Sequence, residues 1–237
     1  MKNILSKVVP DTIDVNSGLI SLVKQNEMEA LKNSEKFLNW AKKISRMDIV
    51  IKEITVLKVH MFGSQLGFAH INVDATTNDG KFIPGITFIR GDSVFMLSIL
   101  EEEETGIEWY VLTYQPRIAV GSYIFEIPAG MIDDDSGEVS SVALKELIEE
   151  VGSELQPMKS DLKLLDSGTA TTPGALDETG KIFVFKKVLP AKTIASINNK
   201  RSGLDDEDIT VKLVKKEDFL STVQSMPAKV AFLLYHQ

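Results

Sequence analysis

The chain contains no cysteine and only three histidines among its 237 residues. The absence of cysteine excludes disulfides, cysteine nucleophiles and thiolate metal sites, and it is compatible with a reducing compartment. His60 and His70 fall in strand-like stretches, where packing or surface positions are more common than metal ligation. These absences remove several classes of catalytic site before any motif is considered.

The sequence also lacks an excess of positive charge and lacks long apolar runs. Its net charge of −8 argues against general binding to nucleic acids or anionic membranes. No stretch approaches the ~20 apolar residues that a membrane helix needs, and the first residues, MKNILSKVVPDTID, contain no long apolar segment. We therefore expect a soluble, cytoplasmic protein. A hydrophobic share of 43% is ample for a packed core.

The most informative stretch is a predicted helix over residues 138–151, which contains no glycine or proline. Asp135 or Ser136 is suited to cap its start, and Gly152 stands where a helix usually ends. At helical spacing one face is predicted to be apolar, comprising Leu144, Leu147, Ile148 and Val151.

The opposite face of this helix is predicted to be acidic, with Glu146, Glu149 and Glu150 at i, i+3 and i+4. Three crowded carboxylates repel one another unless a cation lies among them, and oxygen ligands suit Mg²⁺ or Mn²⁺. On spacing alone, a solvated acidic face is the commoner explanation for such a cluster.

The residues around the cluster favour a functional interpretation. The segment KELIEEVG, residues 145–152, follows Ala129-Gly130 and Glu138 and resembles the Nudix box. There are departures: Lys145 stands where the family has arginine, Ser153 replaces a hydrophobic residue, and the loop before Glu138 is two residues longer than the pattern. The loop change weakens any role for Glu138 and leaves the three helix carboxylates in place.

The resemblance covers most of the chain from about Phe37 onward. The segments VHMFGSQLGFAHINVDA, VLTYQPRIAVGSYIFEIPAGMIDDD and SGTATTPGALDETGKIFVF are similar to the ADP-ribose/ADP-sugar diphosphatase branch of the Nudix family, especially its plant-type members. This resemblance implies metal-dependent hydrolysis of an ADP-sugar to AMP and a sugar phosphate, with ADP-ribose first and ADP-glucose next. It also implies a homodimer.

The same resemblance implies a ligand set for the metal. Glu146 and Glu150 would hold Mg²⁺, with Mn²⁺ as the alternative, and Glu149 and the Ala129 carbonyl would be further ligands. The run Asp133–Asp135 is better explained as a solvated loop before the helix N-terminus, where negative charge is favourable.

Four residues are predicted to contact the substrate. Arg117 follows a predicted strand, and its planar guanidinium suits a diphosphate. Arg90 is a weaker candidate, for which a purely structural role is equally plausible. Gly130, where the backbone can approach a ligand closely, and the adjacent Met131 complete the set.

Two residues compete for the role of general base. Glu178 lies in the Thr- and Gly-rich loop 168–180, where this branch of the family places an acidic residue that activates water. Glu149 is its rival. For Glu178, an ordinary exposed loop carboxylate is an equally good explanation.

The predicted organisation has three parts. Residues 1–47 form a helical extension, in which Ser34 caps a helix with Phe37, Trp40, Ala41 and Ile44 on one face. Residues 48–90 are predicted to form a small antiparallel β subdomain, and residues 91–237 the larger domain. The resemblance implies that the β subdomain dimerises and that residues 91–237 fold as a Nudix-type α/β/α sandwich with a mixed sheet. A final helix starting at Pro227 is predicted to bury Val230, Leu233 and Leu234.

Two rival functions remain open from the sequence. One is a Nudix hydrolase for another nucleoside diphosphate sugar or a dinucleotide, because the box specifies diphosphate chemistry and says little about base or sugar. The other is a catalytically weak ADP-ribose-binding protein, although three mutually repelling carboxylates argue against a pure binder.

Overall fold

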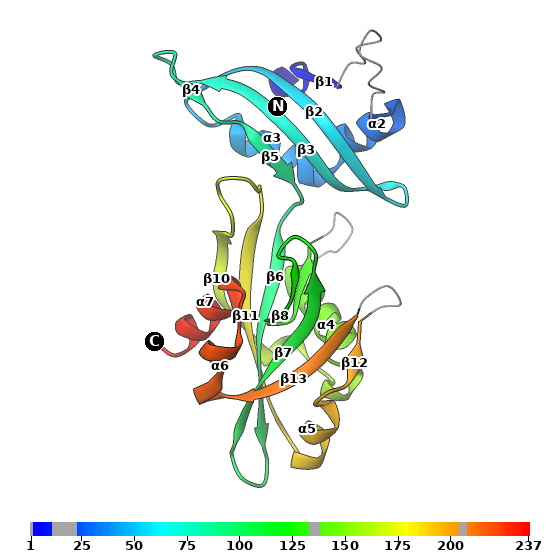
Figure 1. Cartoon of the computed structure of the whole chain (residues 1–237), viewed down its shortest axis with the longest axis vertical. Coiled ribbons are helices and arrows are strands. Elements are labelled where there is room, and N and C mark those ends of the chain that lie inside the picture. The colour runs from blue at the N-terminus through cyan, green and yellow to red at the C-terminus, as the bar shows by residue number, and fades with distance from the viewer. Residues whose placement is uncertain (1, 11–22, 133–137, 204–207) are drawn as a thin grey trace. The chain divides into compact units, whose positions relative to one another are not determined.

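The structure is a computed structural model that describes residues 2–10, 23–132, 138–203 and 208–237. It divides into two compact units (Figure 1). The N-terminal unit comprises Met1–Asp92 together with Thr172–Glu178, and the C-terminal unit comprises Ser93–Thr171 and Thr179–Gln237. The loop that carries Glu178 therefore belongs to the N-terminal unit, although its flanking strands lie in the other.

In its described residues, the N-terminal unit combines a five-stranded sheet with three helices. Its strands are β1 (Val8–Pro10), β2 (Val50–Phe62), β3 (Gln65–Thr76), β4 (Phe82–Ile83) and β5 (Ile86–Ile89). Its helices are α1 (Lys2–Leu5), α2 (Gln25–Asn33) and α3 (Glu35–Ile44). β2 to β5 pair antiparallel, as predicted, whereas β1 adds a parallel edge to β2 that the sequence did not indicate.

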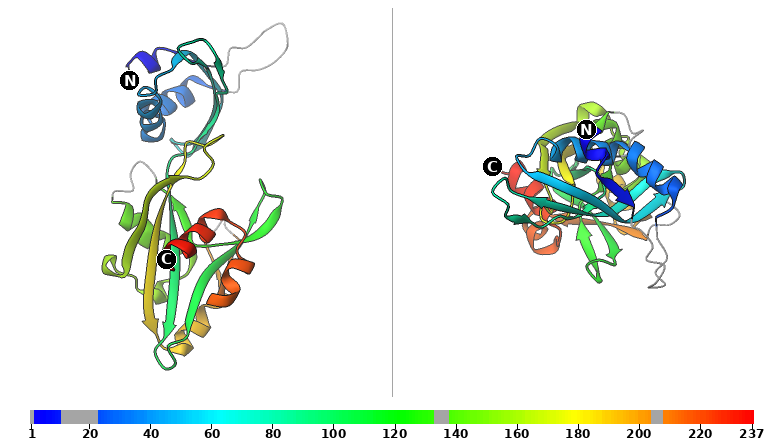
Figure 2. Two further views of the ribbon diagram at one scale, coloured as in Figure 1. Left: turned by 90° about the vertical axis from the view of Figure 1, so that its left-hand side faces the viewer. Right: turned by 90° about the horizontal axis from the view of Figure 1, so that it is seen from above.

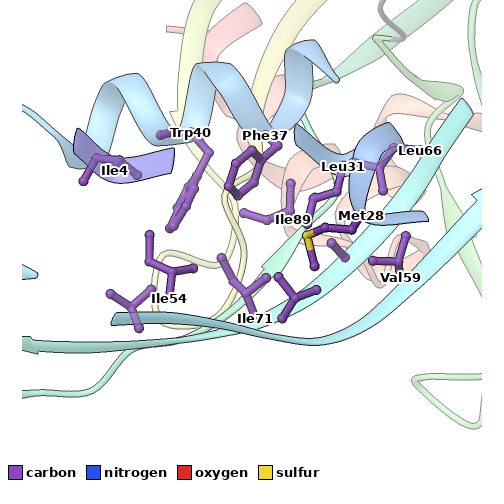
Figure 3. Close-up of a cluster of buried hydrophobic side chains, with 14 of the residues drawn as sticks. Ile4, Met28, Leu31, Phe37, Trp40, Ile54, Val59, Leu66, Ile71 and Ile89 are labelled. Carbon is purple, nitrogen blue, oxygen red and sulfur yellow. The ribbon is translucent and has the colours of Figure 1, made fainter. Parts of the chain in front are cut away.

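The core of this unit lies between α2, α3 and one face of the sheet. Phe37 and Trp40 extend from α3 toward the strands that carry Ile54 and Ile71 (Figure 3). The predicted cap is also present, because the Ser34 hydroxyl accepts a hydrogen bond from the Phe37 N–H at 3.2 Å. The apolar stripe predicted for this helix therefore packs as expected.

The C-terminal unit is built on an eight-stranded mixed sheet. The strands are β6 (Ser93–Glu102), β7 (Glu108–Arg117), β8 (Ser122–Glu126), β9 (Ala129–Met131), β10 (Leu162–Ala170), β11 (Thr179–Leu189), β12 (Arg201–Ser202) and β13 (Ile209–Lys215). The main path runs β10-β11-β6-β7-β13-β12, with β11 parallel to β6 and the other pairs antiparallel. β9 pairs with the start of β6, and β8 pairs with the end of β7.

Helices cover both faces of this sheet. The helices are α4 (Val139–Glu150), α5 (Ala191–Ile197), α6 (Lys216–Thr222) and α7 (Met226–Tyr235), with short 3₁₀ turns at Ser153–Leu155 and Lys159–Asp161. One core joins α4 and α5 to one face, and a second joins α6 and α7 to the other, so that α4 and α7 lie on opposite sides (Figure 2). Alternate residues of β6 enter the two cores, as a strand buried on both faces requires. The predicted α/β/α sandwich is confirmed.

Two predicted helix faces are each wrong at one residue, while Leu147 of α4, Val151 just after it, and Val230 and Leu234 of α7 lie in or against the core as predicted. On α4, Ile148 is 41% exposed while Glu150 is 6% exposed, so the buried face is rotated toward the acidic residues. On α7, Leu233 is 54% exposed, and the buried large residue is Phe232. Phe232 stacks on Phe219 of α6 with ring centroids 4.7 Å apart.

Among the described residues, no helix combines the length and apolar character that crossing a membrane requires. The division at residues 47 and 90 and the dimerisation of the β subdomain stay predictions.

The Ser34 cap yields a stability prediction. Replacing Ser34 with alanine removes the acceptor for the Phe37 N–H and should lower the free energy of unfolding by about 1 kcal/mol. Urea unfolding followed by Trp40 fluorescence measures this in a Trp109→Phe background, because the other tryptophan lies in the C-terminal unit. Ser45→Ala is the control, since it removes only an exposed hydroxyl bond to the Lys42 carbonyl. Equal effects of the two substitutions would contradict the cap assignment.

Candidate active site

The site begins where α4 lies against the short strand β9. A Cβ atom added at Gly130 would lie 2.0 Å from Cδ and 2.2 Å from Oε1 of Glu146. The Glu146 carboxyl therefore rests directly on the β9 backbone, in space that only glycine leaves open. This contact explains why glycine is needed at position 130 without any appeal to a turn.

A second carboxylate of α4 reaches the same strand. Glu150 accepts a hydrogen bond from the Ala129 N–H, with Oε2 at 3.1 Å, and its side chain is buried. Glu146 and Glu150 are one helical turn apart, so both meet β9 from one side of α4. The structure thus brings together Glu146, Glu150, Ala129 and Gly130, whose roles in binding metal and substrate stay predictions.

The end of α4 is held by residues that the sequence analysis missed. The Ser202 hydroxyl donates to the Glu150 carbonyl, and the Gly203 N–H donates to the Glu149 carbonyl at 3.2 Å. The last carbonyls of a helix have no partner within the helix, so these bonds satisfy two of them. No local pattern could have identified Ser202, which ends the two-residue strand β12 in a polar region of the sequence.

Glu149, the third acidic residue, points toward a different partner. Its carboxylate lies 3.6 Å from Nζ of Lys145, one turn earlier, and both side chains retain solvent exposure. Lys145 therefore makes an ordinary i,i+4 pair on the helix surface. A pair of this kind is weak and leaves Glu149 able to exchange partners.

The donor set fits a hard divalent cation. Two carboxylates lie against the β9 backbone, and carboxylate oxygens are ligands that Mg²⁺ and Mn²⁺ prefer. Within the described part of the chain, no three Asp, Glu or His side chains lie close enough together to hold an ion as they stand.

Arg117 lies at the end of β7, as predicted, and is held by Glu126 of β8. Its Nε is 2.6 Å from Oε2 of Glu126, a short charge-assisted hydrogen bond. Val111 of the same strand enters the core beneath α4, and residues alternate along a strand, so Arg117 lies on the α4 face of the sheet. Glu126 was not among the predicted residues, although its place before Pro128-Ala129-Gly130 was a usable signal.

Met131 ends β9 and pairs with Ser93 of β6, half-buried beside Gly130. Glu138 precedes α4, and its carboxylate pairs with Lys159, which holds the pKa of Glu138 below its ordinary value. Glu138 is therefore engaged away from β9, in agreement with the doubt raised by the longer loop. The Asp133–Asp135 run and the predicted caps Asp135 and Ser136 lie outside the described residues.

The two remaining predicted residues lie in the N-terminal unit. Nε of Arg90 is 3.3 Å from Oε1 of Glu178. Glu178 is only 5% exposed, so it is not an ordinary exposed loop carboxylate. The neighbouring Asp177 accepts hydrogen bonds from the backbone N–H groups of Arg90 and Gly91. Burial raises the pKa of Asp177, while these two bonds oppose the shift.

Comparison with known proteins identifies relatives by sequence and by fold. The chain is 32% identical over 200 residues to "Nudix hydrolase 14, chloroplastic" of Arabidopsis thaliana, a match that covers 77% of this chain and 63% of that protein. The chain thus spans less than two thirds of the length of this relative. The crystal structure of an ADP compounds hydrolase superposes with a TM-score of 0.58 at 18% identity, covering 80% of this chain and 93% of that one. No family model matches the chain. The predicted resemblance and the predicted fold are confirmed.

The contact between Gly130 and Glu146 can be tested through stability. Gly130→Ala forces the Glu146 side chain off β9 and should cost about 1–3 kcal/mol, the usual range for overpacking. Urea unfolding followed by circular dichroism measures the loss, and Gly174→Ala is the control because nothing lies within 4 Å of a Cβ there.

A double variant separates this contact from a general strand effect. Adding Glu146→Ala to Gly130→Ala removes the clashing atoms, so part of the lost stability should return. Strictly additive losses would show that Glu146 does not lie on Gly130.

Proposed function

The chain is a homologue of a Nudix hydrolase, and from this premise we propose that it is a metal-dependent hydrolase of ADP-sugars. The proposed substrates are ADP-ribose first and ADP-glucose next, and the products are AMP and a sugar phosphate. The observation that carries the proposal is the convergence of Glu146 and Glu150 on the backbone of β9. Two carboxylates held against one strand are suited to bind a cation, whereas an acidic helix face in solvent would make no such contacts.

Glu146 and Glu150 are the proposed principal metal ligands, with Glu149 and the Ala129 carbonyl as further ligands. A divalent cation bound there, proposed to be Mg²⁺ or Mn²⁺, would screen the diphosphate charge and lower the pKa of a coordinated water. The protein's part is to hold these oxygens at fixed positions. The contact of Glu146 with Gly130 and the hydrogen bond of Glu150 to Ala129 supply that rigidity.

Arg117 is proposed to bind the diphosphate. Its hydrogen bond to Glu126 fixes the plane of the guanidinium on the α4 face of the sheet, which suits bidentate contacts to phosphate oxygens. Gly130 and Met131 are proposed to line the substrate position along β9. Arg90 is the weaker candidate, because its ion pair with Glu178 also supports a structural role.

Glu178 is the proposed general base, and Glu149 is the rival. A general base accepts the proton of the attacking water as the bond between water oxygen and phosphorus forms and the bridging P–O bond breaks. Burial of Glu178 supports a specific role for this side chain. The exposed pair with Lys145 leaves Glu149 available as well.

A homodimer formed through the β subdomain, residues 48–90, is also proposed. Phe82 of β4 is 73% exposed and Ile86 of β5 is 64% exposed, and both strands pair with β3. Phe62, Phe68 and Phe88 form a further aromatic row, with adjacent ring centroids 5.1 and 5.3 Å apart. Apolar surface of this kind is usual at protein interfaces. Cytoplasmic localisation stays a prediction.

The proposed activity is tested with a panel of nucleoside diphosphate sugars and dinucleotides in the presence of Mg²⁺. A coupled phosphatase releases inorganic phosphate from the hydrolysis products, and the rate of phosphate release is measured. Turnover should be greatest with ADP-ribose or ADP-glucose. Glu150→Gln should reduce kcat by about 10²-fold or more, because it weakens a contact worth several kcal/mol.

Two controls make the result specific. Glu154→Gln changes a nearby exposed carboxylate paired with Lys200 and should leave turnover unchanged, and Lys145→Ala should cost far less than Glu150→Gln. Preference for another nucleotide would favour the rival diphosphate substrate. Tight, metal-independent binding of ADP-ribose without turnover would favour the ADP-ribose-binding protein.

The identity of the base is decided by pH–rate profiles of Glu178→Gln and Glu149→Gln. Removing the base should lower kcat by about 10²–10⁴-fold and abolish the decline of kcat at acidic pH. We expect this result for Glu178→Gln. A profile that keeps its acidic limb in that variant and loses it in Glu149→Gln would assign the base to Glu149.

A further inference from the structure

The loop that carries Glu178 is paired with the end of β5 through its backbone. The Phe88 N–H donates to the Ala175 carbonyl at 2.8 Å, and the Asp177 N–H donates to the Phe88 carbonyl at 3.4 Å. Phe88 and Leu176 form a parallel β-bridge. Residues 175–177 therefore act as a short added strand beside β5, which pairs with β3 through Ala69–Asn72.

Asp177 extends this attachment beyond the bridge. Its Oδ1 accepts the Arg90 N–H at 2.8 Å and the Gly91 N–H at 3.2 Å. These two donors lie immediately after the last residue of β5, where the strand ladder stops. A carboxylate that accepts two backbone N–H groups is a strong local anchor, because each bond is charge-assisted.

The anchor adjoins the proposed base. Arg90 is held twice, through its backbone N–H by Asp177 and through its side chain by Glu178. The preceding residues 172–175 are exposed, whereas Glu178 is buried. Asp177 therefore lies between the exposed part of the loop and the buried side chain of Glu178.

We propose that Asp177 is a positioning residue, which fixes the Glu178 carboxylate by tying its loop to the backbone of Arg90 and Gly91. This inference rests on the proposed function, in which Glu178 is the base. The base would then depend on the N-terminal unit of its own chain for its orientation. Loss of the tie would give Glu178 the freedom of an exposed loop, and small misplacements of catalytic groups are costly.

The test is a cycle of variants assayed with the ADP-sugar that the wild type hydrolyses fastest. Asp177→Ala should lower kcat by about 10- to 100-fold with KM changed by less than about threefold, because positioning is lost while binding is kept. Asp177→Asn retains an oxygen acceptor and should recover most of the loss. Asp74→Ala, which removes an exposed carboxylate from β3, should leave kcat unchanged.

The decisive comparison uses Glu178→Gln as the background. If Asp177 acts only through Glu178, adding Asp177→Ala to Glu178→Gln should cause no further loss of kcat. Wild-type kcat in Asp177→Ala, or losses that multiply in the double variant, would overturn the proposal.

Amide hydrogen exchange separates this inference from the proposed function. The amides of Arg90 and Gly91 should exchange faster in Asp177→Ala than in the wild type and remain protected in Asp177→Asn. Unchanged exchange in Asp177→Ala would overturn the anchor. If the wild type turned over no nucleoside diphosphate compound, the proposed function would fail, and the exchange result alone would still decide whether Asp177 anchors the loop.

Discussion

The contact between α4 and the backbone of β9 is the constraint on which the proposed active site depends. β9 is held by the start of β6, an interior strand, and α4 is held by the core on one face of the same sheet. Glu146 and Glu150 therefore meet β9 at positions determined by packing that lies beneath them. Rigid support of this kind is what a metal or diphosphate site needs, because the geometry must exist before the ligand arrives.

The three acidic side chains of α4 differ in their surroundings. Glu146 rests on the strand at Gly130, Glu149 lies beside Lys145, and Glu150 accepts the Ala129 N–H. Each of the three carboxylates therefore has a different partner. α4 can carry three acidic residues within two turns because each has its own partner: the Gly130 backbone for Glu146, Lys145 for Glu149 and the Ala129 N–H for Glu150.

The sequence predicted the helices and strands better than it predicted which face of each helix is buried. The β-branched stretches became β2 and β3, and the cap at Ser34 held, because local propensity and tertiary structure agree there. The outward position of Ile148 and the burial of Phe232 depend on packing partners that periodicity does not contain.

In the candidate site, likewise, the local motif was predictable and the contacts between distant residues were not. The Nudix box was sufficient to predict that Glu146, Glu150 and Ala129 lie together. It could not show that Glu126 holds Arg117, or that Asp177 binds the backbone after β5, because these partners are far apart in the sequence. Long-range contacts of this kind carry no local signature, so only the folded chain reveals them.

The tie between Ser202 and the end of α4 has a consequence for how the protein folds. Ser202 is 52 residues away from Glu150, whose carbonyl it satisfies. On the ribosome, α4 emerges before Ser202 does, so the Glu150 carbonyl lacks this partner until the strand pair β12–β13 is made. The proposed metal ligands would accordingly be among the last parts of the C-terminal unit to become rigid. A nascent chain that has completed its helix would still lack a finished site.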